Sequence, residues 1–189
     1  MRRCRGNPGM GEEDETGLLE RIRQGEATAL RFLVDEKLPR IQGLARRILN
    51  DAGDAEDVAQ ETLVRVWRRP PICRPGGRAL DAWMHRVAVN LCLDRLRRRR
   101  ETPTAELPEI ADESPTPERR VLSMSVGDRI GASLNTLSVR QRLAIVLCHF
   151  QHLSNIEAAD SMGISVEALE SVLSRARRTM RAELADLVD

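Results

Sequence analysis

Hydrophobic side chains recur every three to four residues through most of this chain, a spacing typical of amphipathic α-helices. In the first half of the chain, this period predicts four helical segments. They span residues 16–25, 27–50, 54–69 and 80–100. Helical periods resume near residue 119 and continue to the end of the sequence. No segment shows the strict alternation of a strand, so we predict an all-α protein.

Local signals place some of the helix boundaries. Thr16 is a candidate N-cap, and Gly25 is expected to end the first helix. Residues 27–50 contain two helical patterns, with Pro39 either at a first turn or at a kink. The Pro70–Pro71 pair is expected to stop the third helix.

The helical period is interrupted over residues 101–118, which contain four prolines, six carboxylates and no basic residue. Such a composition predicts an extended, flexible linker. Residues 1–13 are polar and glycine-rich, and we expect a disordered leader there. The predicted architecture is therefore two small helical domains, residues 14–100 and 119–189, joined by an acidic, proline-rich linker.

Residues 155–174, NIEAADSMGISVEALESVLS, have the spacing of a helix-turn-helix. Ala159 is small where two helices must approach closely, and Gly163 stands at the turn, where a positive φ is needed. Ser165 is a natural N-cap for the second helix, and Leu169 belongs to the apolar side of that helix. A plain helical hairpin within a bundle is the alternative interpretation.

The outward side of the second helix is the candidate DNA-reading surface of this motif. In a helix-turn-helix, early residues of that helix contact base edges, and nearby cations contact phosphates. The candidate residues are Glu167, Ala168, Glu170, Ser171, Ser174, Arg175 and Arg178. Arg177 and Arg181 enlarge the basic cluster, although an arginine run by itself can also be a solvated face.

The helix over residues 54–69 has two polar features. Acidic residues near its start favour the helix dipole, which accounts for Asp54, Glu56 and Asp57. A second face has members spaced by three, one and three residues, and the dipole accounts less well for all of them except Asp57. That face consists of Asp57, Gln60, Glu61 and Val64.

The helix over residues 80–100 carries a polar stripe with spacings of four, four and three. The stripe consists of Arg86, Asn90, Asp94 and Arg97. The arginines continue to Arg100, and a polar stripe that ends in arginines suits contact with nucleic acid. The alternative is a surface helix with an ion pair between Asp94 and the arginines that follow it. Trp83 lies on a neighbouring side, and we expect it in the core.

Composition narrows the class of protein. The formal net charge is +1, but the charges are segregated into arginine clusters and acidic stretches. The four cysteines form no CxxC pair, which favours a reducing compartment. No apolar run approaches the roughly 20 residues of a membrane span, and the start lacks the apolar stretch of a signal peptide. We therefore expect a cytoplasmic protein without membrane insertion.

The sequence contains little that indicates catalysis. We find no nucleophile–base arrangement and no glycine loop suited to phosphate, so we expect neither enzymatic activity nor a cofactor. Cys148, His149 and His152 form one cluster that could hold a metal, since positions 148 and 152 share a face on a helix. A clear fourth ligand is missing, so the predicted metal content is none.

Three segments, in this order, resemble the extracytoplasmic-function (ECF) group of bacterial RNA polymerase sigma factors. They are DAEDVAQETLVRVW, DAWMHRVAVNLCLDRLRRRR and LSVRQRLAIVLCHFQHLSNIEAADSMGISVEALESVLSRARRTMR. The resemblance covers about residues 14–100 and 119–185. It implies a subunit without catalytic activity that binds core RNA polymerase and directs promoter-specific initiation.

The resemblance also implies a role for each surface. Docking on the clamp helices of the largest polymerase subunit would use Asp57, Gln60, Glu61 and Val64. Contact with the minus-10 promoter element during its melting would use Arg86, Asn90, Arg97 and Arg98, with phosphate contacts continuing to Arg100. The helix-turn-helix would read the minus-35 element as duplex. The flap of the second-largest subunit and an anti-sigma factor are the other implied partners.

The recognition helix departs from the family pattern. Family members often have Gly-Thr-Val and then a basic residue at its start, whereas here Glu170 stands where a cation is common. The promoter sequence that other family members recognise therefore cannot be assigned to this chain. Glu170 could accept a hydrogen bond from a cytosine amino group or simply face water. Two other classes stay open at this point: a dimeric helix-turn-helix regulator and a metal sensor.

Overall fold

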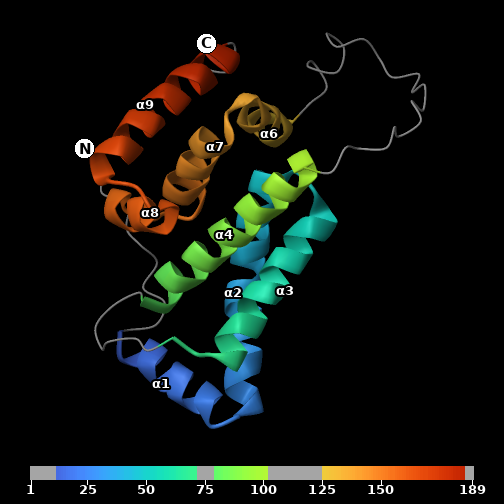
Figure 1. Cartoon of the computed structure of the whole chain (residues 1–189), viewed down its shortest axis with the longest axis vertical. Helices are drawn as coiled ribbons and strands as arrows, with labels where there is room; N and C mark the ends of the chain where they lie inside the picture. Colours follow the sequence, from blue (N-terminus) through green and yellow to red (C-terminus); the bar gives the residue numbers. More distant parts are fainter. Residues whose placement is uncertain (1–11, 72–78, 102–124, 186–189) are drawn as a thin grey trace, which may run out of the picture.

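The computed structural model describes residues 12–71, 79–101 and 125–185, and all regular elements in these ranges are helices (Figure 1). The first unit comprises α1 Glu12–Arg23, α2 Ala27–Leu49, α3 Ala52–Arg68 and α4 Ala79–Glu101. The second comprises α6 Val126–Thr136, α7 Val139–Ile145, the π-helical turn η1 Val146–Phe150, α8 Asn155–Met162 and α9 Val166–Glu183. The all-α prediction is confirmed. The predicted leader up to residue 11 and the predicted linker from residue 102 lie outside the described residues.

The first unit is built around an antiparallel pair, α2 and α3. Asn50 ends α2 in the left-handed conformation, and the Asp51 side chain then caps α3 by accepting a hydrogen bond from the Asp54 backbone N–H at 2.9 Å. Apolar residues of α3, together with Thr62, recur at the helical period and are buried. They are Ala55, Val58, Ala59, Thr62, Leu63 and Val66. The hydrophobic period of this helix was therefore sufficient to identify its core side.

One predicted boundary was wrong: Thr16 does not cap α1, because the helix begins four residues earlier, at Glu12. Of the two alternatives for Pro39, the first turn of a new helix is wrong, because α2 runs through Pro39 to Leu49. A proline inside a helix removes one backbone hydrogen bond, but α2 has buried leucine and isoleucine side chains on both sides of it, at Leu33 and Ile41. Packing of this continuous apolar side of α2 offsets the free energy lost with that hydrogen bond.

The second unit contains the predicted helix-turn-helix. Ser154 and Glu157 form a capping box at the start of α8, and Gly163 ends this helix with a φ of 64°. Ser165 caps α9 by accepting from the Ala168 backbone N–H at 3.2 Å. Ala159 and Leu169 are buried where α8 and α9 meet. These features confirm the helix-turn-helix in place of a plain hairpin.

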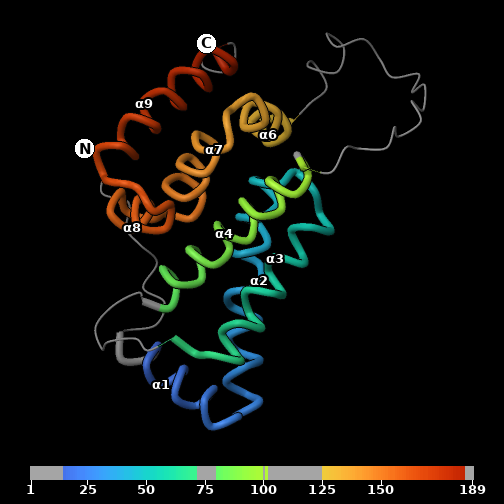
Figure 2. The backbone as a smooth tube through the Cα atoms, in the orientation of Figure 1, coloured from blue at the N-terminus to red at the C-terminus, as the bar shows by residue number. Residues whose placement is uncertain are grey.

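The two units pack against each other. Figures 1 and 2 show α4 passing beside α8, and η1 faces α2. The sequence predicted two domains joined by a tether and gave no indication of this contact. No helix within the described ranges is long and apolar enough to cross a membrane.

Candidate protein-docking and nucleic-acid interfaces

An open groove of about 440 Å³ runs between α3 and α4. All four residues of the acidic face of α3 line it: Asp57, Gln60, Glu61 and Val64. The opposite side comes mainly from α4, with Leu91, Arg95 and Arg98. This second side was not predicted from the sequence as part of the face, although the spacing of four and three residues places its members on one side of a helix. The groove therefore combines carboxylates, a half-buried valine and guanidinium groups in one surface.

The acidic groups of the groove already have basic neighbours. The Asp57 carboxylate lies 3.6 Å from Arg95, and Arg65 donates to Glu61 at 2.9 Å. The Asp57 side chain is nevertheless 67% exposed. Ion pairs at such exposed positions contribute little to stability. Both carboxylates can therefore exchange their present arginine partners for a cationic group of another protein.

The arginines at the end of α4 have two different kinds of surroundings. Arg99 lies 3.0 Å from the Asp51 carboxylate and donates to the Leu49 carbonyl at 3.2 Å, where α2 leaves its last carbonyls without helical partners. Arg95 turns toward Asp54, at 3.4 Å. Both therefore hold the α2–α3 corner against α4, whereas Arg97 and Arg98 are exposed. The predicted phosphate contacts thus include one arginine, Arg99, that has a structural role, and the Arg100 side chain lies outside the described residues.

The predicted polar stripe of α4 is exposed along its whole length. Its members are Arg86, Asn90, Asp94 and Arg97. Arg97 lies 3.9 Å from Asp94, the ion pair that the alternative interpretation expected. Arg86 instead forms an ion pair with Asp160 of α8 in the other unit. Trp83 is partly buried and packs against the core, as predicted.

Every candidate residue on α9 is exposed. They are Glu167, Ala168, Glu170, Ser171, Ser174, Arg175 and Arg178. Glu170 is held in place from α8, because the Asn155 amide donates to its carboxylate at 3.3 Å. Hydrogen bonding from the backbone and then from the Ser165 hydroxyl lowers the pKa of Glu167, so this carboxyl stays ionised. The front of α9 therefore presents two carboxylates, followed by arginines on later turns.

The candidate metal cluster is not assembled. His152 follows η1 with a φ of 57°, so positions 148 and 152 are not on one helical face, and that premise was wrong. The Cys148 thiol faces the Asn155 side chain at 4.0 Å, and burial raises its pKa. Within the described ranges, no three histidine, cysteine or acidic side chains are placed to share a metal ion.

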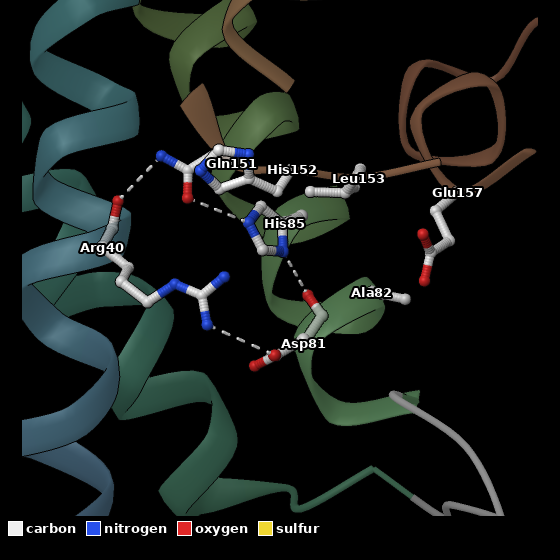
Figure 3. Close-up of a pocket in the computed structure, with 8 residues that line it drawn as sticks. All are labelled: Arg40, Asp81, Ala82, His85, Gln151, His152, Leu153 and Glu157. Carbon is white, nitrogen blue, oxygen red and sulfur yellow. Dashed lines mark hydrogen bonds and ion pairs between the residues drawn. The ribbon is translucent and has the colours of Figure 1, made fainter. Parts of the chain in front are cut away.

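A small cavity of about 20 Å³ lies between the two units (Figure 3). It is lined by Arg40, Asp81, Ala82, His85, Gln151, His152, Leu153 and Glu157. Its volume matches about one water molecule, and its walls are mostly polar. Apart from His152, which was predicted only as a member of a metal cluster, none of these residues was predicted from the sequence, because they come together only through the contact between the units.

Two family models match the sequence: Sigma-70 region 2 over residues 33–102, and Sigma-70, region 4 over residues 127–180. The ECF RNA polymerase sigma factor SigL of Mycobacterium tuberculosis is 32% identical over 171 residues, which cover 86% of this chain and 92% of that protein. The ECF RNA polymerase sigma factor SigE of Mycolicibacterium smegmatis is 35% identical over 157 residues, which cover 81% of this chain but only 60% of that protein.

Similar solved structures include CnrH in complex with the cytosolic domain of CnrY, with a TM-score of 0.66 and 27% identity over 91% of this chain and 97% of that chain. The sigma factor RpoE in complex with the anti-sigma factor NepR, from Bartonella quintana, has a TM-score of 0.64 and 24% identity over 82% of this chain and 96% of that chain. The second likeness concerns the fold alone.

Proposed function

Because the chain belongs to the ECF group of RNA polymerase sigma factors, we propose that it binds core polymerase through the α3–α4 groove and directs initiation at promoters that its own helices select. The observation that carries this proposal is the separation of surfaces by charge. The α3 side of the groove carries exposed carboxylates, whereas the α4 side of the groove, the outward side of α4 and the later turns of α9 carry arginines. One set suits a basic protein surface, and the other suits phosphates.

Each nucleic-acid surface has a distinct task in this proposal. On α4, the stripe residues Arg86, Asn90 and Arg97 contact the minus-10 element while its bases leave the stack, together with Arg98, which lines the groove. The outward side of α9 lies in the major groove of the minus-35 duplex, as helix-turn-helix recognition helices do. Both contacts, with the minus-10 and the minus-35 element, belong to one polymerase-bound subunit. Once one of them forms, the other becomes intramolecular, so its effective concentration is high and the two contacts strengthen each other.

An anti-sigma factor is the proposed regulator. The similar chains CnrH and RpoE were solved with CnrY and with the anti-sigma factor NepR, respectively. A protein inhibitor of this chain would have to cover the α3–α4 groove, because the groove is the proposed polymerase contact. The flap of the second-largest polymerase subunit is proposed as a further contact, for the second unit.

Run-off transcription tests the proposal. Core polymerase with this chain should initiate at a defined set of promoters, and sequencing of the selected promoters should give one minus-35 and one minus-10 motif. A dimeric helix-turn-helix regulator would instead bind DNA without core polymerase and would leave core polymerase without promoter selectivity. That second outcome would refute the proposal.

Glu170 is expected to set one base preference in the minus-35 element. A carboxylate held by Asn155 can only accept, so it favours the amino group of cytosine, whereas an amide can both donate and accept and favours adenine. Glu170→Gln should therefore shift the preference at one position by about tenfold, as a change of one base contact does. Holoenzyme binding to single-base promoter variants measures this shift. Glu183→Gln, an exposed change at the far end of α9, is the control, and equal preferences in both variants would contradict the prediction.

A further inference from the structure

Glu170, on the exposed front of α9, is held by a side chain from the other helix of the helix-turn-helix. The Asn155 amide, at the first position of α8, donates to the Glu170 carboxylate at 3.3 Å. Within the described part of the chain, this is the only polar partner of the Glu170 side chain. Beneath the contact, Ala159 and Leu169 are buried where the two helices meet. This rigid packing keeps Asn155 and Glu170 facing each other.

The α9 helix itself gives Glu170 no cation to pair with. Side chains three or four residues apart are neighbours on the surface of a helix. Those positions around Glu170 hold Val166, Glu167, Leu173 and Ser174. The nearest charge along the helix is therefore a second carboxylate, which repels Glu170. The orientation of the Glu170 side chain thus depends on the contact from α8.

The Cys148 thiol of η1 determines which end of the Asn155 amide faces α9. The thiol lies 4.0 Å from Asn155 Oδ1, a weak contact between a sulfur donor and an amide oxygen. Burial raises the pKa of Cys148, so the thiol keeps its proton and acts as the donor. The amide oxygen is turned toward the thiol, and the amide nitrogen, which only donates, is therefore turned toward Glu170.

A carboxylate that is held in one position discriminates between bases better than one that samples several rotamers. Oε1 of Glu170 takes the hydrogen bond from Asn155, which leaves Oε2 for a base edge. An ionised carboxylate only accepts hydrogen bonds, and the cytosine amino group is a donor in the major groove. Ordering a glutamate side chain on binding costs rotamer entropy, and a contact that orders it beforehand removes part of that cost. The gain applies only to the base that the fixed carboxylate reaches.

We propose that Asn155 is a positioning residue for minus-35 recognition. It holds the Glu170 carboxylate in front of one base pair, so that the base preference at that pair depends on α8 as well as on α9. The expected partner is a cytosine amino group, bound by Glu170 Oε2 while Asn155 stays on Oε1. This inference rests on the proposed reading of the minus-35 duplex by α9. Asn155 acts through Glu170 and makes no base contact of its own.

Asn155→Ala tests this role, because it removes the amide without adding a charge, and alanine favours the helix. The holoenzyme should lose about threefold of its preference for the favoured base, as expected for the loss of one exposed hydrogen bond. The loss should occur at the one position that Glu170→Gln also changes, and preferences at all other positions should stay unchanged. Affinities of the holoenzyme for single-base variants of the minus-35 element measure each preference as a ratio.

Asn135→Ala is the matched control. It makes the same substitution at an exposed position of α6, where the backbone carbonyl and not the side chain contacts Arg142. Every base preference of this variant should equal that of the wild type. A second comparison starts from Glu170→Ala, which removes the carboxylate. Addition of Asn155→Ala to that variant should change no base preference further, because Asn155 then has nothing to position.

Three results would overturn the inference. Uniform weakening of Asn155→Ala on all promoter variants would make Asn155 a phosphate contact. An equal loss of preference with and without the Glu170 carboxylate would mean that Asn155 reads the base directly. Unchanged preferences in Asn155→Ala would show that Glu170 needs no contact from α8. All three leave the proposed function standing, whereas a holoenzyme of the wild-type chain without any promoter selection would refute it.

Discussion

Replacing Glu61 with arginine is expected to weaken binding to core RNA polymerase by about tenfold or more, because like charges brought together at an interface cost several kcal/mol. Glu61 is near the middle of the acidic side of the α3–α4 groove and already pairs with Arg65 at 2.9 Å. Reversal of its charge removes that pair and places two arginines one helical turn apart. Pull-down of core polymerase over a range of chain concentrations measures the change.

The matched control is Glu36→Arg, which makes the same charge change at an exposed position of α2 that does not line the groove. Its binding should equal that of the wild type within about twofold, because an isolated surface charge contributes little. Asp57→Arg should act like Glu61→Arg, with a further effect from the loss of the Arg95 neighbour at 3.6 Å. Equal binding by Glu61→Arg and Glu36→Arg would exclude the groove as the docking surface.

The groove also shows which part of the site was predictable from the sequence. Its α3 side follows from the helical period alone, because the buried positions of a helix also determine which residues face outward. Its α4 side depends on how closely two helices approach and at what angle, and neither is present in the pattern of one helix. Arg95 and Arg99 illustrate the difference. Both belong to a cluster that suggests nucleic acid, yet both pair with carboxylates at the start of α3.

The contact between the two units was beyond sequence reasoning for a related physical reason. Gln151 and Arg142 are polar residues in a segment whose period indicates only a helix, and polar residues are ordinarily assigned to solvent. Gln151 becomes buried because a π turn and a left-handed residue redirect the chain after α7. Helix propensity carries no signal for such a turn. By contrast, the helix-turn-helix was predictable because Gly163, Ser165 and Ala159 each have a local conformational reason for their positions.

Leu169→Ala is expected to destabilise the second unit by about 2–5 kcal/mol, the range for removing a fully buried leucine side chain. Leu169 is completely buried at the base of α9, so its loss leaves a cavity beneath the proposed minus-35 surface. The free energy of unfolding of a whole domain is only about 5–15 kcal/mol. In the variant, the second unit should therefore unfold at a lower urea concentration than the first unit. Circular dichroism during urea unfolding measures the shift.

Arg181→Ala, an exposed change on the same helix, is the control and should alter the free energy of unfolding by less than about 0.5 kcal/mol. The functional consequence of Leu169→Ala should be selective, because the α3–α4 groove belongs entirely to the first unit. At urea concentrations that unfold only the second unit, the variant should still bind core polymerase through the groove while its recognition of the minus-35 duplex is lost. If Leu169→Ala instead unfolded together with the control, α9 could not be packed on α8 as described, and the surface proposed for DNA reading would lose its structural basis.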